Sequence, residues 1–481
     1  MQVQEAKRWV TNSAMAAEYS ADLGDARRGR RARQVGVSIA MKPNLSFPKL
    51  FSNEAELEGF YRLVENEDVE WRELLRAHAQ QTVERVAQAG EVLIIHDTTD
   101  VRFRTYWPER IRSRMSAVSV AWHGLQVHTS LAATASGPLL PLGVLDAQPF
   151  VHKNDLPDYD KTTQAYWLDE GGLYDNEAER WYRAVDQTEQ QIRGASARAI
   201  HVMDREGDSY ALLGYMLAEQ ANFVVRCAHK KRLRIGETTV VGKEHVQLGE
   251  VRPKRNDCDR TNPPRKGRSA LLTIRYGEGK MIRNDKSGVE KLSPMDWKSL
   301  PGELRMNVVE AIEEHPPAGQ KPVHWVLMTS EPIGTVDQAM RVVDIYRRRW
   351  LIEEYFRALK CGCKLEQRQA ESAPVLLRVL MLLIPAAWRL LLLRQLGEEE
   401  PDASWRSILT PPEFRILKNA VPKAKLDANA TAAQCHLAIA KLGGHLPRNG
   451  RPGWETLHTG WQRICDFLEG ARLSRRDPIN A

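Results

Sequence analysis

The sequence predicts an α/β protein in which a β-containing middle is flanked by helical segments at both ends. Short apolar runs at 92–95 and 199–203 are typical of buried strands. Residues 1–70 and 373–473 show helical patterns instead. At roughly 100–200 residues per domain, the chain of 481 residues suffices for about two to four domains.

The composition is that of an ordinary soluble protein, with 42% hydrophobic and 27% charged residues. The net charge of +7 is by itself only a weak indication of a polyanionic partner. Six cysteines in a chain of this length do not form a disulfide framework. Cys361 and Cys363 are too close together for a zinc knuckle, so we expect reduced thiols and no structural zinc.

We expect no association with a membrane. The N-terminus carries charges where a signal peptide has an apolar core. Segment 375–393 is apolar, but it contains Arg378, Pro385 and Arg389, which are costly or disruptive in lipid. The segment is therefore predicted to be a buried helix of a cytoplasmic protein.

A strongly basic helix is predicted near the N-terminus, with Asp25 as its N-cap. Its first turns carry five arginines within seven residues and no acid. Such a run is most often a solvated helix face. The arginines are Arg27, Arg28, Arg30, Arg31 and Arg33. Further helices are expected near 54–65, with capping-box residues Asn53 and Glu56, and over 72–89, ending at Gly90.

The middle of the chain alternates between strand and helix patterns. Strands are expected near 124–134, 139–147 and 223–226, and a polar helix near 176–193. Residues 230–268 contain twelve Lys/Arg and five Asp/Glu, so this segment is strongly basic. Strand-like alternation resumes at 269–276, 304–312 and 323–329. A long helix is then predicted from Val336, capped by Thr335, through Lys360.

Three acids stand out by position. Asp97 and Asp204 are each placed at the end of a predicted buried strand, and strand ends are where α/β sheets bind ligands. Glu353 is selected by helix geometry: at about 100° per residue, it shares one narrow stripe with Tyr346, Arg349 and Lys360, whereas Glu354 lies about 100° away. A stripe with a phenol, two cations and a carboxylate is a poor core face, and it suits a phosphate backbone.

Converging carboxylates would suit a divalent metal, because Mg²⁺ prefers carboxylate oxygens and water. Two such ions roughly 3.5–4 Å apart can activate an attacking oxygen and stabilise a leaving one. Structural interpretations remain open for each feature. Asp97 fits a cap or turn acid, the 204–206 run fits a salt-bridged turn, and the 346–360 stripe fits interhelical ion pairing.

Three segments resemble the DDE transposases of the IS4 type: IIHDTTD at 94–100, VMDREGD at 202–208 and YRRRWLIEEYFRALK at 346–360. The last contains the family's Y-(2)-R-(3)-E-(6)-K signature, matched at all four positions. LGDARR at 23–28, WVLMTSEP at 325–332 and IAKLGG at 439–444 add to the resemblance, which covers nearly the whole length. The segment after Asp97, the middle of the β segment and much of 395–435 depart from the family pattern.

The resemblance implies an RNase H-like catalytic core with a large β-rich insertion, flanked by helical N-terminal and C-terminal domains. The implied divisions are a DNA-end-binding domain over 1–70, a catalytic domain over 71–372 with the insertion at about 227–330, and a dimerisation domain over 373–481. Asp97, Asp204 and Glu353 would be the catalytic, metal-binding triad. The implied cofactor is Mg²⁺, with Mn²⁺ as a substitute.

The resemblance also implies roles in DNA binding. Tyr346, Arg349 and Lys360 would hold phosphates, and Trp325 would stack on a base flipped out of the duplex. Without the resemblance, the alternating strand pattern predicts that Trp325 is a core tryptophan. The transposon end would be read by the basic N-terminal helix, and Arg226 with the 230–268 cluster would add backbone contacts. The arginines assigned to end binding are Arg27, Arg28, Arg30 and Arg31.

The implied activity is cut-and-paste transposition. Both strands at the transposon ends would be cut through a hairpin intermediate, and the freed 3′-OH ends would be joined to target DNA. The partners are double-stranded DNA and a second copy of the chain, in a nucleoid-associated bacterial protein. The Trp454/Trp461 stripe of the last helix fits either dimerisation or internal core. Two alternatives remain: a nuclease of the same fold without strand transfer, and an inactive DNA-binding inhibitor of transposition.

Overall fold

The computed structural model describes residues 7–10, 12–103, 116–119, 122–152, 173–174, 177–228, 233–248, 268–283, 300–446, 448 and 452–476. Residues 230–232 and 249–267 of the basic 230–268 segment, including Cys258, lie outside the described residues. The chain divides into two compact units. Unit 1 comprises Met1–Asp175, Ala184–Arg198 and Trp350–Ala481, and unit 2 comprises Asn176–Arg183 and Ala199–Arg349.

The helices of unit 1 come from both ends of the chain. The N-terminal ones are η1 (Lys7–Val10), α2 (Asn12–Glu18), α3 (Ala26–Met41), α4 (Phe47–Leu50), α5 (Glu54–Glu65) and α6 (Trp71–Ala89). The C-terminal ones are α12 (Leu351–Arg357), η5 (Ala358–Gly362), η6 (Leu365–Gln367), α13 (Ala373–Glu399), η7 (Trp405–Ser407), α14 (Pro411–Ala420), η8 (Pro422–Ala424), α15 (Ala432–Leu442) and α16 (Trp454–Arg476).

Several sequence-predicted helix ends are confirmed. The Asp25 carboxylate accepts hydrogen bonds from the Arg27 and Arg28 amides at the start of α3. The Asn53 side chain accepts from the Glu56 amide at the start of α5. Gly90 ends α6 with φ +73°, a left-handed conformation that glycine adopts without steric cost.

The strands of unit 1 lie side by side in the order β5-β4-β3-β1. Their bounds are β1 (Glu91–Phe103), β3 (Trp122–Thr134), β4 (Pro141–His152) and β5 (Leu173–Tyr174), and β2 (Ser116–Ser119) pairs with β3. β1 and β3 pair in antiparallel register from Val92↔Thr134 to Phe103↔His123. β1 therefore extends well beyond the apolar run at 92–95.

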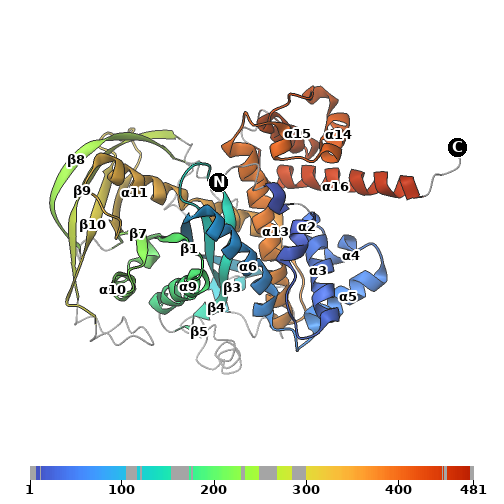
Figure 1. Ribbon diagram of the computed structural model, residues 1–481, viewed down its shortest axis with the longest axis horizontal. Coiled ribbons are helices and arrows are strands. Elements are labelled where there is room, and N and C mark those ends of the chain that lie inside the picture. Colours follow the sequence, from blue (N-terminus) through green and yellow to red (C-terminus); the bar gives the residue numbers. More distant parts are fainter. Residues whose placement is uncertain are drawn as a thin grey trace. The chain divides into compact units, whose positions relative to one another are not determined.

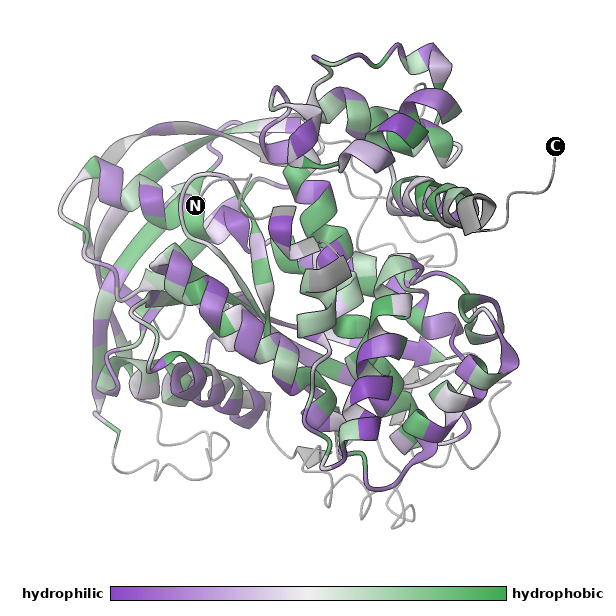
Figure 2. Cartoon of the chain, turned by 45° about the vertical axis from the view of Figure 1, so that its right-hand side comes forward, coloured by the Kyte–Doolittle hydropathy of each residue, from purple (hydrophilic) through white to green (hydrophobic). Residues whose placement is uncertain are grey.

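Unit 2 contains a second mixed set of strands, in the order β6-β7-β11-β10-β9-β8. β6 (Arg198–Met203) and β7 (Asn222–Arg226) are parallel. β11 (His324–Thr329), β10 (Glu303–Ile312), β9 (Arg268–Ile282) and β8 (Leu233–Leu248) continue the sheet with antiparallel neighbours. Figure 2 shows hydrophobic residues in green along these strands. The sequence predicts a β-rich insertion at about 227–330, but it does not predict β8 as an individual strand.

The helices of unit 2 lie around this sheet. η3 (Arg205–Gly207) and α10 (Tyr210–Ala218) follow β6, and α11 (Val336–Arg348) packs against β7, β9, β10 and β11 (Figure 1). Thr335 caps α11, as predicted, in a capping box with Gln338. α9 (Glu177–Ile192) is divided between the two units.

α13 is the central helix of unit 1, and it packs against α3, α5, α6 and β4 (Figure 1). By length and composition it could cross a membrane, but its most apolar window is 100% buried inside the protein. Arg378, Trp388 and Arg389 are also buried. The apolar segment at 375–393 is therefore a core helix, as the sequence predicts.

Buried arginines of α13 and of the segment before it bind the carbonyl ends of N-terminal helices. Arg378 donates to the Val64 carbonyl at 2.9 Å, near the end of α5, and to the Val69 carbonyl at 2.6 Å. Arg389 donates to the Ala40 carbonyl at 3.1 Å, near the end of α3. Arg368 donates to the Pro43 and Leu45 carbonyls. Because the last carbonyls of a helix lack intrahelical partners and carry partial negative charge, these guanidinium groups cap both helices.

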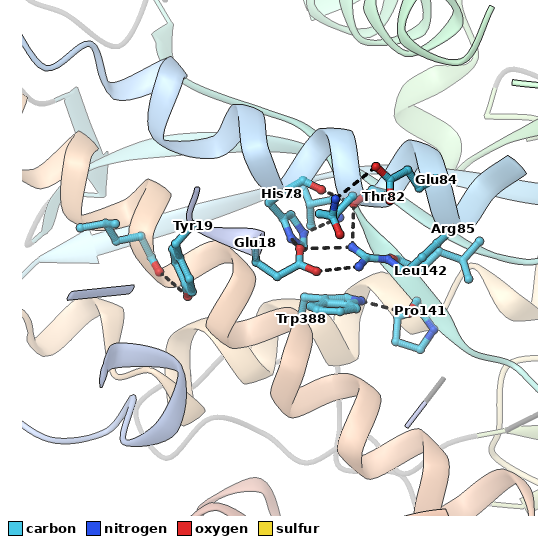
Figure 3. A network of polar contacts seen from close by, with 12 residues as sticks. Glu18, Tyr19, His78, Thr82, Glu84, Arg85, Pro141, Leu142 and Trp388 are labelled. Atoms are coloured by element: carbon cyan, nitrogen blue, oxygen red, sulfur yellow. Dashed lines mark hydrogen bonds and ion pairs between the residues drawn. The ribbon is translucent and has the colours of Figure 1, made fainter. Parts of the chain in front are cut away.

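A second buried network joins α2, α6, β4 and α13 (Figure 3). Glu18 binds the Arg85 guanidinium at 2.6 Å and the His78 Nδ1 at 2.5 Å. The Val144 amide donates to His78 Nε2 at 3.0 Å, so His78 is neutral and its Nδ1 carries the proton. The Arg85 guanidinium lies over the Trp388 ring, 4.3 Å from its centroid. Every charge in this core site therefore has a partner.

The C-terminal helices form their own core within unit 1. Trp454, Leu457, Trp461 and Ile464 of α16 are buried. α16 packs against α14, α15 and η5. The Trp454/Trp461 stripe is therefore internal core of this unit.

Replacing Arg378 by Met should loosen α5. The Val64 and Val69 carbonyls would lose a charged donor, which costs about 3 kcal/mol for buried groups. Hydrogen exchange of the α5 amides should accelerate roughly a hundredfold, since 1.4 kcal/mol corresponds to about a factor of ten. Arg62→Met is the matched control, because Arg62 forms an exposed i,i+4 pair with Glu58 on the same helix and should cost less than about 0.5 kcal/mol. Equal exchange in the two variants would contradict the capping role.

Acidification should destabilise unit 1 through the Glu18–His78 site. Burial lowers the pKa of His78 below 6.5, although Glu18 opposes this. Burial alone would raise the pKa of Glu18, but His78 and Arg85 together hold it below 4.5. As the pH falls, the unfolded chain therefore takes up protons at His78 and Glu18 before the folded protein does. Each of these two sites can lower the free energy of unfolding by up to about 1.4 kcal/mol per pH unit.

The melting temperature should therefore fall as the pH drops from 6.5 toward 4.5, and fall further below 4.5 as Glu18 is protonated. His78→Gln should start from a lower melting temperature and show a flatter dependence between these pH values. A pH series of thermal unfolding for the two proteins measures this. Parallel curves would show that His78 does not carry the effect.

Candidate functional site

Asp97 lies inside β1 and not at its end. The strand continues to Phe103 because Thr98, Thr99 and Val101 are β-branched residues that pair across to β3. The prediction of a strand end at Asp97 is therefore wrong. The side chain is half-buried, opposite Thr129 in the register, and it accepts a hydrogen bond from the Thr98 amide at 2.8 Å.

Asp204 directly follows β6, as predicted from the apolar run. Its carboxylate caps the short helix η3 by accepting the Glu206 amide at 2.8 Å. Glu206 lies 3.5 Å from the Arg180 guanidinium. These contacts agree with the structural interpretation of 204–206 as a salt-bridged turn. Asp204 is half-buried, so part of its side chain remains exposed.

The predicted helix over 336–360 is interrupted. α11 ends at Arg348 and α12 begins at Leu351, with the unit boundary between Arg349 and Trp350. At the junction the Arg349 amide donates to the Tyr346 carbonyl and the Glu353 amide to the Trp350 carbonyl, which are three-residue steps. A π-helical turn, η5, follows at Ala358–Gly362. A uniform 100° per residue therefore does not hold from Tyr346 to Lys360.

Glu353 and Glu354 nevertheless have different environments. Glu354 binds Arg357 at 2.6 Å, Arg394 at 2.9 Å and the Trp454 indole N–H at 2.9 Å. These contacts tie α12 to α13 and α16. Glu354 is thus a structural residue, and the half-buried Glu353 beside it is the better candidate for chemistry.

Glu353 and Asp97 stand on neighbouring elements of unit 1, since α12 packs against β1. Three residues further along β1, Asp100 accepts hydrogen bonds from Arg102 at 2.7 Å and Gln126 at 3.1 Å. Burial alone would raise the pKa of Asp100, but Arg102, Gln126 and Lys360 hold it below its usual value. Lys360 Nζ lies 3.9 Å from the Glu366 carboxylate. Lys360 thus brings positive charge to Asp100 of β1 and Glu366 of η6.

Tyr346, Trp325 and Arg226 belong to unit 2. Tyr346 is buried on α11, and its ring meets the half-buried Trp325 ring edge-on, with centroids 5.3 Å apart. Trp325 is therefore not a fully buried core residue. Arg226 donates to the His324 carbonyl on β11 at 3.3 Å, and Arg349 is half-buried at the end of α11.

Of the predicted triad, Asp97 and Glu353 lie in unit 1 and Asp204 in unit 2, so the meeting of the three carboxylates stays a prediction. Within the described ranges, no three or more His, Cys, Asp or Glu side chains are grouped so that they could hold a metal ion. The donor types fit Mg²⁺, because Asp and Glu supply the hard oxygen ligands that it prefers.

The arginines of α3 divide into three groups. Arg27 and Arg30 are exposed. Arg28 pairs with Asp68, and the Arg31 guanidinium lies against Gly59 of α5, where an added Cβ would come within 2.6 Å of it. Arg31 also lines a pocket of about 670 Å³ next to α3 and α5, with Arg33, Gln34, Phe51 and Glu56 among the other lining residues.

Trp350 is an exposed aromatic residue that the sequence reading did not single out. It lies one turn before Glu353, and its indole is 44% exposed with the Arg357 guanidinium 5.9 Å from the ring. The sequence could have pointed to Trp350, because it lies between Arg349 and Glu353 in the matched signature. An exposed indole next to a candidate catalytic carboxylate offers a stacking surface.

Comparisons with known protein families give two matches. The family model for transposase DNA-binding matches residues 9–69, which span α2 to α5. The family model for the transposase DDE domain matches residues 175–387, which include Asp204, Trp325, Tyr346 and Glu353. The basic helix α3 therefore lies in the matched DNA-binding region.

Glu354→Ala should destabilise unit 1, whereas Glu353→Ala should not do so to the same extent. Without Glu354, the nearly buried Arg394 keeps Glu398, at 3.0 Å, as its one carboxylate partner among the described residues, and the Trp454 indole loses this acceptor. The expected cost is about 2–3 kcal/mol. Urea unfolding of both variants measures the difference. A larger loss for Glu353→Ala would reverse the assignment of the two carboxylates.

Proposed function

Because this chain is a DDE transposase, an enzyme that cleaves and joins DNA with divalent metal ions, we propose that it is of the IS4 type, similar to the Tn5 transposase. In this proposal it binds transposon ends and cuts both strands through a hairpin. It then joins the 3′-OH ends to target DNA. It acts on nucleoid DNA in the bacterial cytoplasm.

The observation that carries the proposal is the placement of the Y-(2)-R-(3)-E-(6)-K element. Its glutamate, Glu353, is half-buried on α12, and α12 packs against the strand that carries Asp97. Its neighbour Glu354 is held by two arginines and an indole. Glu354 is thus committed to structural contacts, and the carboxylate that the signature specifies for chemistry is Glu353.

The proposed reaction consists of four phosphoryl transfers, each forming one P–O bond and breaking one. Water attacks the phosphodiester at the transposon end and releases a 3′-OH, which takes up the proton. That 3′-OH attacks the opposite strand, which closes a hairpin and releases the flanking DNA. A second water opens the hairpin. The restored 3′-OH then attacks target DNA and releases a target 3′-OH.

Asp97, Asp204 and Glu353 are the proposed ligands of the metal ions. Two bound Mg²⁺ ions, or Mn²⁺ in their place, would activate the attacking oxygen and stabilise the leaving oxygen. By holding these ions, the three carboxylates would determine where the reaction takes place. The cations Arg349 and Lys360 would offset the repulsion between these acids and the DNA phosphates.

Tyr346 and Trp325 would act as a pair. Their edge-to-face contact at 5.3 Å orients the half-buried indole of Trp325 on β11. In the proposal this indole stacks on the base that leaves the duplex when the hairpin forms, a contact worth about 1–3 kcal/mol. Arg226 would contact the DNA backbone nearby on the neighbouring strand β7.

The exposed Arg27 and Arg30 at the start of α3 would contact phosphates of the transposon end, where the helix N-terminus adds positive partial charge. Arg28 and Arg31 would contribute from their positions beside Asp68 and Gly59. A second copy of the chain would bind the paired end. The Trp454/Trp461 stripe would not be its contact, because that stripe is already buried within unit 1.

The test is an isosteric replacement of each proposed ligand: Asp97→Asn, Asp204→Asn and Glu353→Gln. The substrate is a duplex carrying an end sequence that the wild-type protein selects from a random DNA pool. Each replacement should abolish cleavage of this duplex while its binding stays within about twofold, because the neutral amides retain shape but hold Mg²⁺ poorly. Exchanging Mg²⁺ for Ca²⁺ in the wild-type protein should likewise permit binding and stop cleavage. Gel assays of cleavage and fluorescence anisotropy of binding measure the two steps.

Glu219→Gln is the control, because Glu219 is an exposed carboxylate after α10 outside the matched motifs. It should cleave like the wild type. Normal cleavage by any of the three triad variants would contradict the ligand assignment. Pre-cut ends supplied to the wild type should be joined to a plasmid target, and cleavage without joining would favour the nuclease alternative.

A further inference from the structure

Four exposed cations cluster in sequence on α14 and the turn η8 that follows it. They are Arg415, Lys418, Lys423 and Lys425, and we refer to them as the α14 patch. The stretch 411–425 contains a single acid, Glu413. The Glu413 carboxylate accepts the Thr410 amide at 2.6 Å and the Thr410 hydroxyl at 2.8 Å, so it is used in capping α14. Within 411–425 the four cations therefore outnumber the acids by three.

The four cations also lack ion-pair partners. Among the residues that the structure describes, no carboxylate lies within 4.0 Å of any of them. Some other exposed cations are paired on their own helices, as Arg62 is with Glu58 and Arg76 with Glu73. One cation at the end of α14 would suffice to offset the helix dipole, which amounts to about half a charge. Four exceed that structural need.

The patch stands on a rigid support. Phe414 and Leu417 of α14 are buried, and the Phe414 ring stacks on Trp405 with centroids 4.1 Å apart. α14 also packs against α15 and α16. Binding a ligand with cations on an ordered helix costs less backbone entropy than ordering a loop.

The chemistry of the patch favours a polyanion over a second copy of the chain. In a dimer contact centred on the patch, with the two-fold axis passing through it, cations would oppose cations. The patch itself contains no exposed large hydrophobic side chain that could enter a membrane. The polyanion that this enzyme handles is duplex DNA.

We propose that the α14 patch binds phosphates of duplex DNA, as a second contact surface in addition to α3. This inference rests on the proposed cut-and-paste function, in which the enzyme handles both transposon-end DNA and target DNA. Either DNA presents the same phosphate backbone. Neutralising each phosphate releases counterions, so each contact adds about 0.9 to the dependence of log Kd on log salt concentration.

The experiment compares the full-length wild type with Lys418→Glu/Lys423→Glu. Binding of an end duplex is measured by fluorescence anisotropy over a salt series. Joining of pre-cut ends is measured against target DNA concentration. Arg193→Glu/Lys321→Glu is the matched control, because it changes the net charge equally at two exposed cations elsewhere. Melting temperatures confirm that all proteins are folded, and Lys418→Arg/Lys423→Arg should behave as wild type.

Two results would support the proposal and identify the DNA. A salt slope for end binding reduced by about 2 assigns the patch to transposon-end DNA. An unchanged slope, with half-saturation of joining moved to about tenfold more target DNA, assigns it to target DNA. Unchanged values in both assays would overturn the proposal, as would a loss confined to binding of vesicles made from anionic phospholipid. If the wild type binds ends but joins none, the proposed function fails, and the salt slope still tests the patch.

Discussion

The buried arginines around α13 constrain how unit 1 is built. A guanidinium group removed from water needs hydrogen-bond acceptors. Arg378 finds them on the Val64 carbonyl near the end of α5 and on the Val69 carbonyl, and Arg389 finds one on the Ala40 carbonyl near the end of α3. α13 therefore reaches its low-energy state only with the N-terminal helices in place. The region matched as DNA-binding is in this way part of the same packed unit as α12, which carries Glu353.

The same constraint determines which end of α3 is available to a ligand. Its C-terminal end is held by Arg389, while its N-terminal turns present the exposed Arg27 and Arg30. Glu18 of α2 adds a second anchor through His78 and Arg85 of α6. An electropositive helix end on a fixed base suits phosphate binding, because little ordering is needed when the ligand arrives.

Glu353 and Glu354 illustrate how tertiary contacts divide the roles of adjacent like residues. In sequence they differ only by helix phase, and the interruption at 349–350 weakens an argument from phase. In the structure, Arg394 and Trp454 come from distant parts of the chain and bind Glu354. Folding uses Glu354, and the proposed catalytic role falls to the neighbouring Glu353. The α14 patch shows the converse, where structural contacts leave several cations available.

The sequence alone determined what depends on local interactions: the α/β class, the caps at Asp25 and Thr335, the end of α6 at Gly90 and the motifs that carry the acids. These features follow from hydrogen bonds and dihedral preferences within a few residues. Tertiary structure decided the length of β1, which depends on pairing with β3, the break between α11 and α12, and the partners of Arg378 and Glu354. Each of these depends on groups remote in sequence, whose approach is fixed only when the core packs.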